Sequence, residues 1–217
     1  MTRNTKGFTL AEMLTAMVVM AIISLASVSL TMALTTAQEY SEDFYRHVQI
    51  ARNSLRRIER DINKAKLITA ADSDTLVYWM DSNDNGEIEL TELRAITTNI
   101  ATGEVSLCRA EFPVFWPPSW KNAWDNSMTV PIATNLTTAV AVIKNVRWAR
   151  SDELANEVSS IRFTTSPAAP TSELVQIELT VGDGPGMVQL RSTAAMRAHK
   201  IEDLYTSGGL YYLEPPE

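Results

Sequence analysis

The chain has 217 residues and a formal net charge of −7, from 19 lysine and arginine residues against 26 aspartate and glutamate residues. This acidic balance argues against a nucleic-acid-binding protein, because such proteins present a basic face to the phosphates. The single cysteine, Cys108, excludes a disulfide bond within the chain, and we expect it to be a small buried hydrophobic residue.

The chain begins with a short basic leader followed by a long uncharged run. Two basic residues precede Gly7 and Phe8, and residues 13–34 contain no charged side chain. As a helix, these 22 residues would extend about 33 Å, enough to cross the hydrocarbon core of a bilayer. A secretory signal peptide carries its cleavage site after the apolar region, whereas the only plausible cleavage site here, after Gly7, precedes that region.

Glu12 lies directly before the uncharged run, where a carboxylate is costly unless it has a partner. Cleavage after Gly7 would create a new α-amine on Phe8, one helical turn from Glu12. The amine of one copy could then neutralise the Glu12 carboxylate of a neighbouring copy. The simpler explanation is an ordinary N-terminal anchor that happens to contain a glutamate.

The stretch KGFTL at residues 6–10, with Glu12 and an uncharged helix after it, resembles the class III leader of type IV pilins and type II secretion pseudopilins. The resemblance implies that a prepilin peptidase cuts after Gly7 and methylates Phe8, and that Glu12 acts in assembly. It also implies three further partners: other pilins or pseudopilins in a helical fibre, an inner-membrane assembly platform, and the lipid bilayer. Many major pilins close a C-terminal loop with a disulfide, so the lone cysteine favours a pseudopilin or a minor subunit.

Charges on the two sides of the uncharged run predict the orientation in the membrane. Arg3 and Lys6 precede the run, and Glu39, Glu42 and Asp43 follow it. By the positive-inside tendency, we expect a single-pass protein of the inner membrane with a cytoplasmic N-terminus. The rest of the chain would be periplasmic or otherwise extracytoplasmic.

Residues 8 to about 68 are predicted to form one helix, because no glycine or proline interrupts them. Beyond the apolar run, hydrophobic residues alternate at spacings of four and three on one face of this helix. These residues are Phe44, Val48, Ala51, Leu55, Ile58, Ile62 and Ala65. We favour packing of this face on the protein's own sheet, with a coiled coil to a partner helix as the alternative. Basic residues at positions 46–66 mingle with acidic ones, which indicates a solvated face.

A predicted strand at residues 74–80 leads into a segment that matches the calcium-loop pattern D-x-[DN]-x-[DN]-G-x5-E. Oxygen ligands would come from Asp81, Asn83, Asn85, the carbonyl group of Glu87, and Glu92. The alternative is a β-hairpin with its tip at residues 85–86, and a calcium-binding turn between strands satisfies both interpretations. We expect no required cofactor, with Ca²⁺ as the one candidate ligand.

Residues 111–131 contain several prolines and tryptophans, a composition that argues against a central strand. Trp116, Trp120 and Trp124 lie four residues apart, which allows a short helical turn after Pro118. This long loop is either a contact surface or a loop that its own tryptophans hold against the body. Both interpretations stay open.

The remaining strands are predicted at residues 94–98, 104–109, 139–148, 158–164, 173–181 and 187–194. The fold class is therefore α+β, with a long N-terminal helix packed on an antiparallel β-sheet, as in pilins. The expected parts are a leader at 1–7, a transmembrane and fibre-core helix at 8–38, an amphipathic extension at 39–68, a β-rich domain at 69–206 and a flexible tail at 207–217.

Residues 55–65 and 190–197 loosely resemble the J-type minor pseudopilins of type II secretion and the related W-type minor pilins. The resemblance implies a structural minor subunit of a pseudopilus or pilus-like fibre. The alternative function is a membrane-anchored, extracytoplasmic, calcium-dependent binding module. We do not expect an enzyme, because the sequence lacks a P-loop, a Gly-x-Ser-x-Gly motif and a zinc-binding pattern, and His47 and His199 have no nucleophile at motif spacing.

Overall fold

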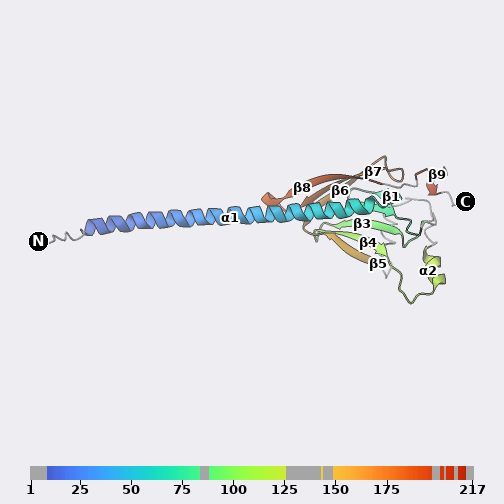
Figure 1. The fold of residues 1–217 in the computed structure, drawn as a ribbon, viewed down its shortest axis with the longest axis horizontal. Helices are drawn as coiled ribbons and strands as arrows, with labels where there is room; N and C mark the ends of the chain where they lie inside the picture. The colour runs from blue at the N-terminus through green and yellow to red at the C-terminus, as the bar shows by residue number, and fades with distance from the viewer. Residues whose placement is uncertain are drawn as a thin grey trace. The chain divides into compact units, whose positions relative to one another are not determined.

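The structure is a computed structural model that describes residues 9–83, 88–125, 143, 149–196, 201–202, 204–207 and 210–213. It begins with helix α1 (Leu10–Ile62), which has 53 residues (Figure 1). The chain forms two compact units, Met1–Tyr45 and Arg46–Glu217.

The described part of the first unit is the N-terminal part of α1. Every large hydrophobic side chain from Leu10 to Leu34 is exposed, with exposed fractions from 49% to 83%. An 18-residue window of α1 has a mean hydropathy of 2.3, so this helix is long and apolar enough to cross a membrane. Exposed apolar surfaces of this extent mark sites that interact with a membrane or with other proteins.

Hydroxyl groups in this part of α1 donate hydrogen bonds to the carbonyl oxygen four residues earlier. Ser24 donates to Met20 at 2.8 Å, and Ser27 donates to Ile23 at 2.9 Å. Thr15, Ser29, Thr31, Thr35 and Thr36 form the same bond. Each hydroxyl is therefore satisfied within its own helix, which lowers the cost of placing it in hydrocarbon.

The second unit contains antiparallel sheets and the C-terminal part of α1. A five-stranded sheet has the order β1 (Leu67–Ala71), β2 (Thr75–Trp79), β3 (Leu93–Asn99), β4 (Glu104–Ala110) and β5 (Ala149–Ala155). A three-stranded sheet has the order β6 (Val158–Ser166), β7 (Leu174–Val181) and β8 (Val188–Ala195). The smaller elements are α2 (Pro118–Asp125), the 3₁₀ turn η2 (Gly184–Gly186) and the hairpin of β9 (Leu204–Ser207) and β10 (Leu210–Leu213). The α+β prediction is confirmed.

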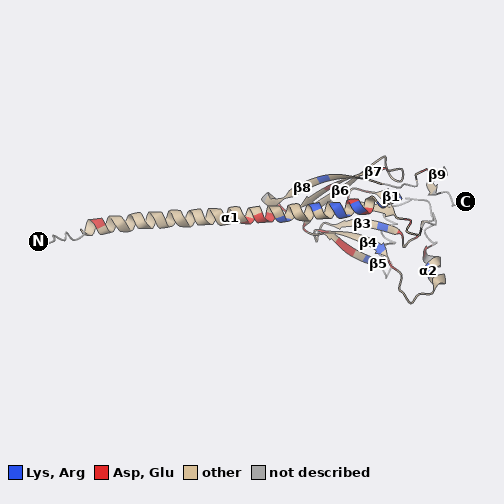
Figure 2. Ribbon diagram, in the orientation of Figure 1, with Lys and Arg blue, Asp and Glu red and all other residues tan. Residues whose placement is uncertain are grey.

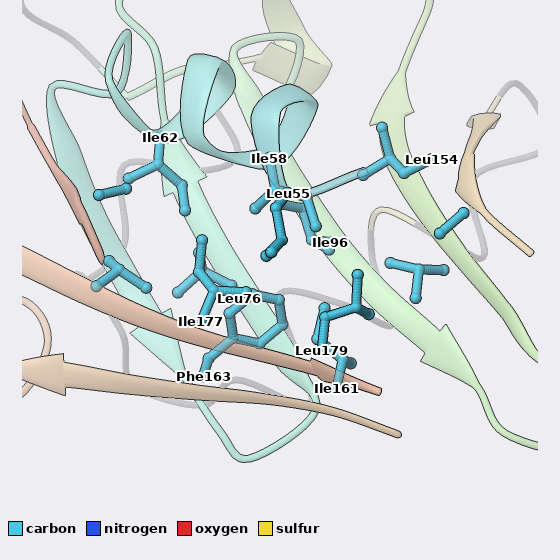
Figure 3. Packing of buried hydrophobic residues seen from close by; sticks show 14 of the residues in the cluster. Leu55, Ile58, Ile62, Leu76, Ile96, Leu154, Ile161, Phe163, Ile177 and Leu179 are labelled. Atoms are coloured by element: carbon cyan, nitrogen blue, oxygen red, sulfur yellow. The ribbon is translucent and has the colours of Figure 1, made fainter. Parts of the chain in front are cut away.

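The main core lies where α1 meets the inner faces of the two larger sheets (Figure 3). Ile58 and Ile62 of α1 are fully buried. They pack in one cluster with Leu76 and Ile96 of the five-stranded sheet and with Ile161, Phe163, Ile177 and Leu179 of the three-stranded sheet. Burying each of these side chains stabilises the unit by roughly 2 kcal/mol. The predicted apolar face of the helix thus packs on the protein's own sheets, although Phe44 is 46% exposed.

A second core covers the other face of the five-stranded sheet. Val77 pairs with Ala95, which in turn pairs with Cys108, so the three side chains form one row on this face. All three are buried in this cluster together with Trp79. The expectation that Cys108 is a buried hydrophobic residue is confirmed.

The structure differs from the predicted elements in several places. Helix α1 ends at Ile62 rather than near residue 68, because residues 63–65 form a tight turn and β1 then pairs with β2. In that turn, the amide of Lys64 donates to Asp61 at 3.1 Å and the amide of Ala65 donates to Ile62 at 3.0 Å. Strands β1 and β5 were not predicted, and the β9–β10 hairpin extends into the expected flexible tail.

Most other predicted elements are confirmed within a few residues. The helical turn after Pro118 corresponds to α2, and Gly103 at the turn between β3 and β4 has a φ of +66°, which favours glycine. The predicted strand at residues 139–148 lies outside the described residues, except for Ile143.

Candidate functional site

The first described residues of the chain form a capping box at the start of α1. The backbone amide and the hydroxyl group of Thr9 each donate a hydrogen bond to Oε2 of Glu12, both at 2.9 Å. The amide of Glu12 donates back to Oγ1 of Thr9 at 3.3 Å. A threonine before the first helical turn and a glutamate three residues later satisfy each other's backbone groups in this way. Thr9 therefore holds the Glu12 carboxylate in a defined position.

The other carboxylate oxygen of Glu12, Oε1, accepts no hydrogen bond from any residue that the structure describes. Gly7 and Phe8, the predicted cleavage and methylation residues, lie outside the described residues. The structure thus provides a local partner for Glu12 that the sequence analysis did not name, and the predicted pairing with the amine of a neighbour stays a prediction. The pattern Thr9-x-x-Glu12 before an apolar run is itself a capping signal in the sequence.

The predicted calcium loop is organised around Glu92, which is 2% exposed. Oε1 of Glu92 accepts hydrogen bonds from the amide and hydroxyl groups of Ser82, at 2.6 and 2.9 Å, and from the amide of Asn83 at 3.1 Å. Oε2 of Glu92 accepts a 2.9 Å bond from the buried indole nitrogen of Trp79. Four donors therefore compensate the cost of burying this carboxylate.

The same contacts bear on calcium binding. Asp81 is buried and has a φ of +42°, and the side-chain amide of Asn83 donates to Glu89 at 3.0 Å. No group of three or more histidine, cysteine, aspartate or glutamate side chains that could hold a metal ion occurs among the described residues, and Asn85 and Glu87 lie outside them. Bidentate binding by Glu92 would require the donors on Oε1 to move away. The calcium site stays a prediction.

The tryptophan segment combines packed and exposed aromatic rings. Trp116 stacks on Phe112, with ring centroids 5.7 Å apart, and meets Trp120 edge to face at 6.0 Å. Phe112 packs against the second core, whereas Val114 and Phe115 are 94% and 84% exposed. The side chain of Trp124 lies outside the described residues. The segment is thus attached through Phe112, while the side chains of Val114 and Phe115 are exposed, and its role as a contact surface stays a prediction.

A buried histidine that the sequence analysis did not assign lies where α1 enters the second unit. Nδ1 of His47 lies 2.8 Å from the carbonyl oxygen of Gly186, and its Nε2 lies 3.3 Å from Oε2 of Glu157. Arg46 pairs with the same Glu157 oxygen at 2.5 Å. The hydrogen bond from Arg46 is the main cause that lowers the pKa of the Glu157 carboxyl. Partial desolvation raises this pKa, but the electrostatic interactions with Arg46 and His47 also lower it, so the net shift is downward.

Gly182 makes room for the His47 ring. Its φ is +81°, and a Cβ atom there would lie 2.4 Å from Nδ1 of His47. The amide of Gly182 also donates to the carbonyl oxygen of Glu157 at 2.7 Å. These residues are far apart in the sequence, so local patterns could not have predicted this clamp, which we define as Arg46, His47, Glu157, Gly182 and Gly186.

Comparison with protein families matches the prokaryotic N-terminal methylation motif to residues 2–28. Neither the comparison with curated proteins nor the comparison with solved structures finds a match. The match covers most of the leader and most of the apolar run, so it describes the start of the chain and not its second unit. The chain therefore carries a prokaryotic N-terminal methylation motif on a long apolar helix, and it has the pilin-like arrangement of that helix with antiparallel sheets.

Proposed function

We propose that this chain is a structural minor subunit that a prepilin peptidase cuts after Gly7 and methylates on Phe8. The processed subunit assembles through its N-terminal helix into a type II secretion pseudopilus or a type IV pilus-like fibre. The observation that carries this proposal is the methylation motif at residues 2–28, which includes the start of a helix whose apolar side chains are exposed on all sides. Before assembly that surface is covered by lipid, and in a fibre by the helices of other subunits.

The capping box supports a specific role for Glu12. Its Oε2 is held by Thr9, and its Oε1 accepts no bond from the described residues, so one oxygen stays available for the cationic amine of Phe8 in a neighbouring subunit. In hydrocarbon, such a pair replaces a costly isolated charge with a charge-assisted hydrogen bond. This pairing gives each incoming helix one preferred position against its neighbour.

The rest of the proposal follows from the motif and the charges. The basic leader stays in the cytoplasm, and the second unit is extracytoplasmic. An inner-membrane platform assembles the subunits, and the chain itself carries out no catalysis. Exposed Val114 and Phe115 favour a second candidate, an anchored binding module that recognises a ligand through this segment, with calcium at residues 81–92. That candidate requires neither processing nor assembly.

Glu12 variants separate these functions in cells that supply the prepilin peptidase and the assembly platform. Glu12→Gln keeps an acceptor for Thr9 but removes the negative charge, whereas Glu12→Ala removes both. We expect both variants to insert into the membrane and to fail in assembly, measured as sheared or cross-linked fibre. Thr9→Val, which weakens only the capping box, should assemble at a reduced level. Normal assembly of both Glu12 variants would contradict the proposal.

The calcium proposal has its own test. Calcium titration followed by the fluorescence of Trp79, whose indole nitrogen bonds to Glu92, should give a saturable change in the wild-type chain. Asn83→Ala and Asp81→Asn should weaken that binding about tenfold or more, because each removes a ligand oxygen or its charge. The absence of any calcium-dependent change would contradict the calcium proposal and leave Glu92 only as the acceptor of the bonds from Trp79, Ser82 and Asn83.

A further inference from the structure

Figure 2 shows several lysine or arginine positions, in blue, along the C-terminal part of α1. Three exposed arginines in this part form what we call the basic face: Arg52, Arg56 and Arg60. The three side chains are exposed and lie four residues apart, so they occupy one side of the helix. The opposite side of the same turns is the buried face that contains Leu55 and Ile58. The arginines therefore point away from the core that holds this part of the helix.

The acidic residues near this row are directed toward the protein. Glu59 is half-buried and accepts a hydrogen bond from Ser192 of β8. Asp61 is half-buried as well, and desolvation raises its pKa despite the nearby charges of Lys64 and Arg60. Arg52 and Arg56 form no ion pair with the part of the chain that the structure describes. The sequence predicted mixed charges on this helix. In the structure, the acidic side chains of Glu59 and Asp61 are half-buried, whereas the basic face is exposed.

The same helix carries an opposite charge earlier in the chain. Glu39, Glu42 and Asp43, which we call the acidic segment, are all exposed. Residues 10–45 contain no lysine, arginine or histidine. In the acidic segment, the side-chain amide of Gln38 donates a hydrogen bond to Glu42 at 2.8 Å. Glu39 and Asp43 lie four residues apart, which is the spacing of Arg52 and Arg56.

We propose that the basic face of one copy binds the acidic segment of a second copy. This inference rests on the proposed assembly, because copies that insert into one membrane in the same orientation have parallel helices. Parallel helices at the same level would place like charges side by side, which is unfavourable. An offset of about 13 residues instead places Glu39 opposite Arg52 and Asp43 opposite Arg56.

This contact joins two different surfaces, the basic face of one copy and the acidic segment of the next. Each copy can therefore bind one further copy through its basic face and another through its acidic segment. Head-to-tail contacts of this kind generate open helical filaments when the rotation does not close into a ring. The Phe8–Glu12 pair requires an offset of only about four residues, so the charge contact joins each copy to a different neighbour in the fibre and sets the stagger of that second pair. Because the side chains are exposed, the contact favours the correct register more than it adds affinity, and salt weakens it.

Charge reversal and exchange in the full-length chain test the proposal. We expect Arg52→Glu with Arg56→Glu to reduce assembly about tenfold or more, because like charges then face each other. Glu39→Arg with Asp43→Arg should have the same effect. The chain with all four substitutions should recover assembly to within about threefold of the wild-type chain, since the complementarity is restored. Processing at Gly7 serves as the control for membrane insertion in every variant.

Cysteine cross-linking measures the offset directly. A chain with Asp43→Cys and Arg56→Cys should form disulfide-linked ladders under mild oxidation, whereas Asp43→Cys alone should not. The wild-type chain is the matched control, because its one cysteine, Cys108, is buried. Cross-links from Asp43→Cys alone would mean that the helices lie at the same level, and they would overturn the proposal.

Two outcomes separate this inference from the proposed function. Normal assembly of the reversed variants would overturn the charge contact and leave assembly through Glu12 intact. Reduced assembly that the fourfold variant does not recover would show that a different subunit, not a second copy, binds the basic face. A wild-type chain that is neither processed nor assembled into a fibre would overturn both.

Discussion

Helix α1 contains two segments that differ in what covers them. Up to Tyr45 its large apolar side chains are exposed around the whole circumference, and from Arg46 onward they are confined to one buried face. A helix that packs on its own sheet needs apolar residues only at spacings of three and four, whereas a helix surrounded by lipid or other helices is apolar throughout. The pattern of apolar residues therefore shows where the helix changes partners.

The substitution with the largest expected effect tests whether only the segment of α1 from Arg46 onward stabilises the second unit. Ile58→Ala removes a fully buried side chain from the main core and should lower the free energy of unfolding by about 3–4 kcal/mol. Denaturant titration in detergent, followed by tryptophan fluorescence, measures this loss. The matched control Ile23→Ala, at a side chain that is 56% exposed, should change it by less than about 0.5 kcal/mol. Equal losses of unfolding free energy in the two variants would show that both segments of α1 contribute to the stability of the folded unit, which would contradict this comparison.

The clamp around His47 lies at the point where the two segments meet. Gly182→Ala should cost about 2 kcal/mol or more, because the new Cβ would overlap the His47 ring and the residue has a positive φ. Gly184→Ala is the control: its φ is +58°, but a Cβ there meets no atom within 4 Å, so we expect a cost of about 1 kcal/mol. A smaller effect at Gly182 than at Gly184 would contradict the clamp.

Acidification should weaken the same clamp. The folded-state pKa of Glu157 lies below its ordinary value of 4.5, so the ionised carboxylate contributes stability above about pH 4.5 and loses it as the pH falls through the folded-state pKa. The Glu157→Gln variant should therefore lose less stability than the wild-type chain between about pH 5 and pH 3. Arg46→Met, which removes the main cause of the shift, should behave in the same way. An unchanged pH profile in both variants would exclude this role.

The smallest expected effect concerns Tyr78, beneath the C-terminal part of α1. Its hydroxyl group is buried and has no hydrogen-bond partner among the described residues, and burial raises the pKa of the phenol. Tyr78→Phe removes a desolvated polar group and keeps the ring, so the free energy of unfolding should stay the same or rise by up to about 1 kcal/mol. A loss of more than that would mean that the hydroxyl has a partner, such as a buried water.

Periodicity and composition correctly predicted the helices and strands whose residue pattern alone determines their structure. The alternating strand β7 and the apolar face around Ile58 follow directly from local pattern. The end of α1 at Ile62 does not, because residues 63–68 contain no helix breaker, and the pairing of β1 with β2 overrides their helical tendency. Strand β5 is charged on its exposed positions, so its pairing with β4 was likewise not visible in the sequence.

The candidate site was predictable to a similar degree. The leader and Glu12 were identified from local motifs, and the capping partner Thr9 was present in the same motif but not recognised. The role of Glu92 depends on the indole of Trp79 across the sheet, and the clamp joins residues more than 100 positions apart. Contacts of that range follow from the fold and not from spacing along the chain.

Intact mass and the N-terminal sequence of the chain produced together with a prepilin peptidase test the proposed processing most directly. We expect a chain that begins at Phe8 and carries one methyl group on its amine. An inactive peptidase should leave the chain uncut and serves as the control. A chain that retains Met1 beside the active peptidase, or one that is cut beyond residue 30, would contradict the assignment of this chain to fibre assembly.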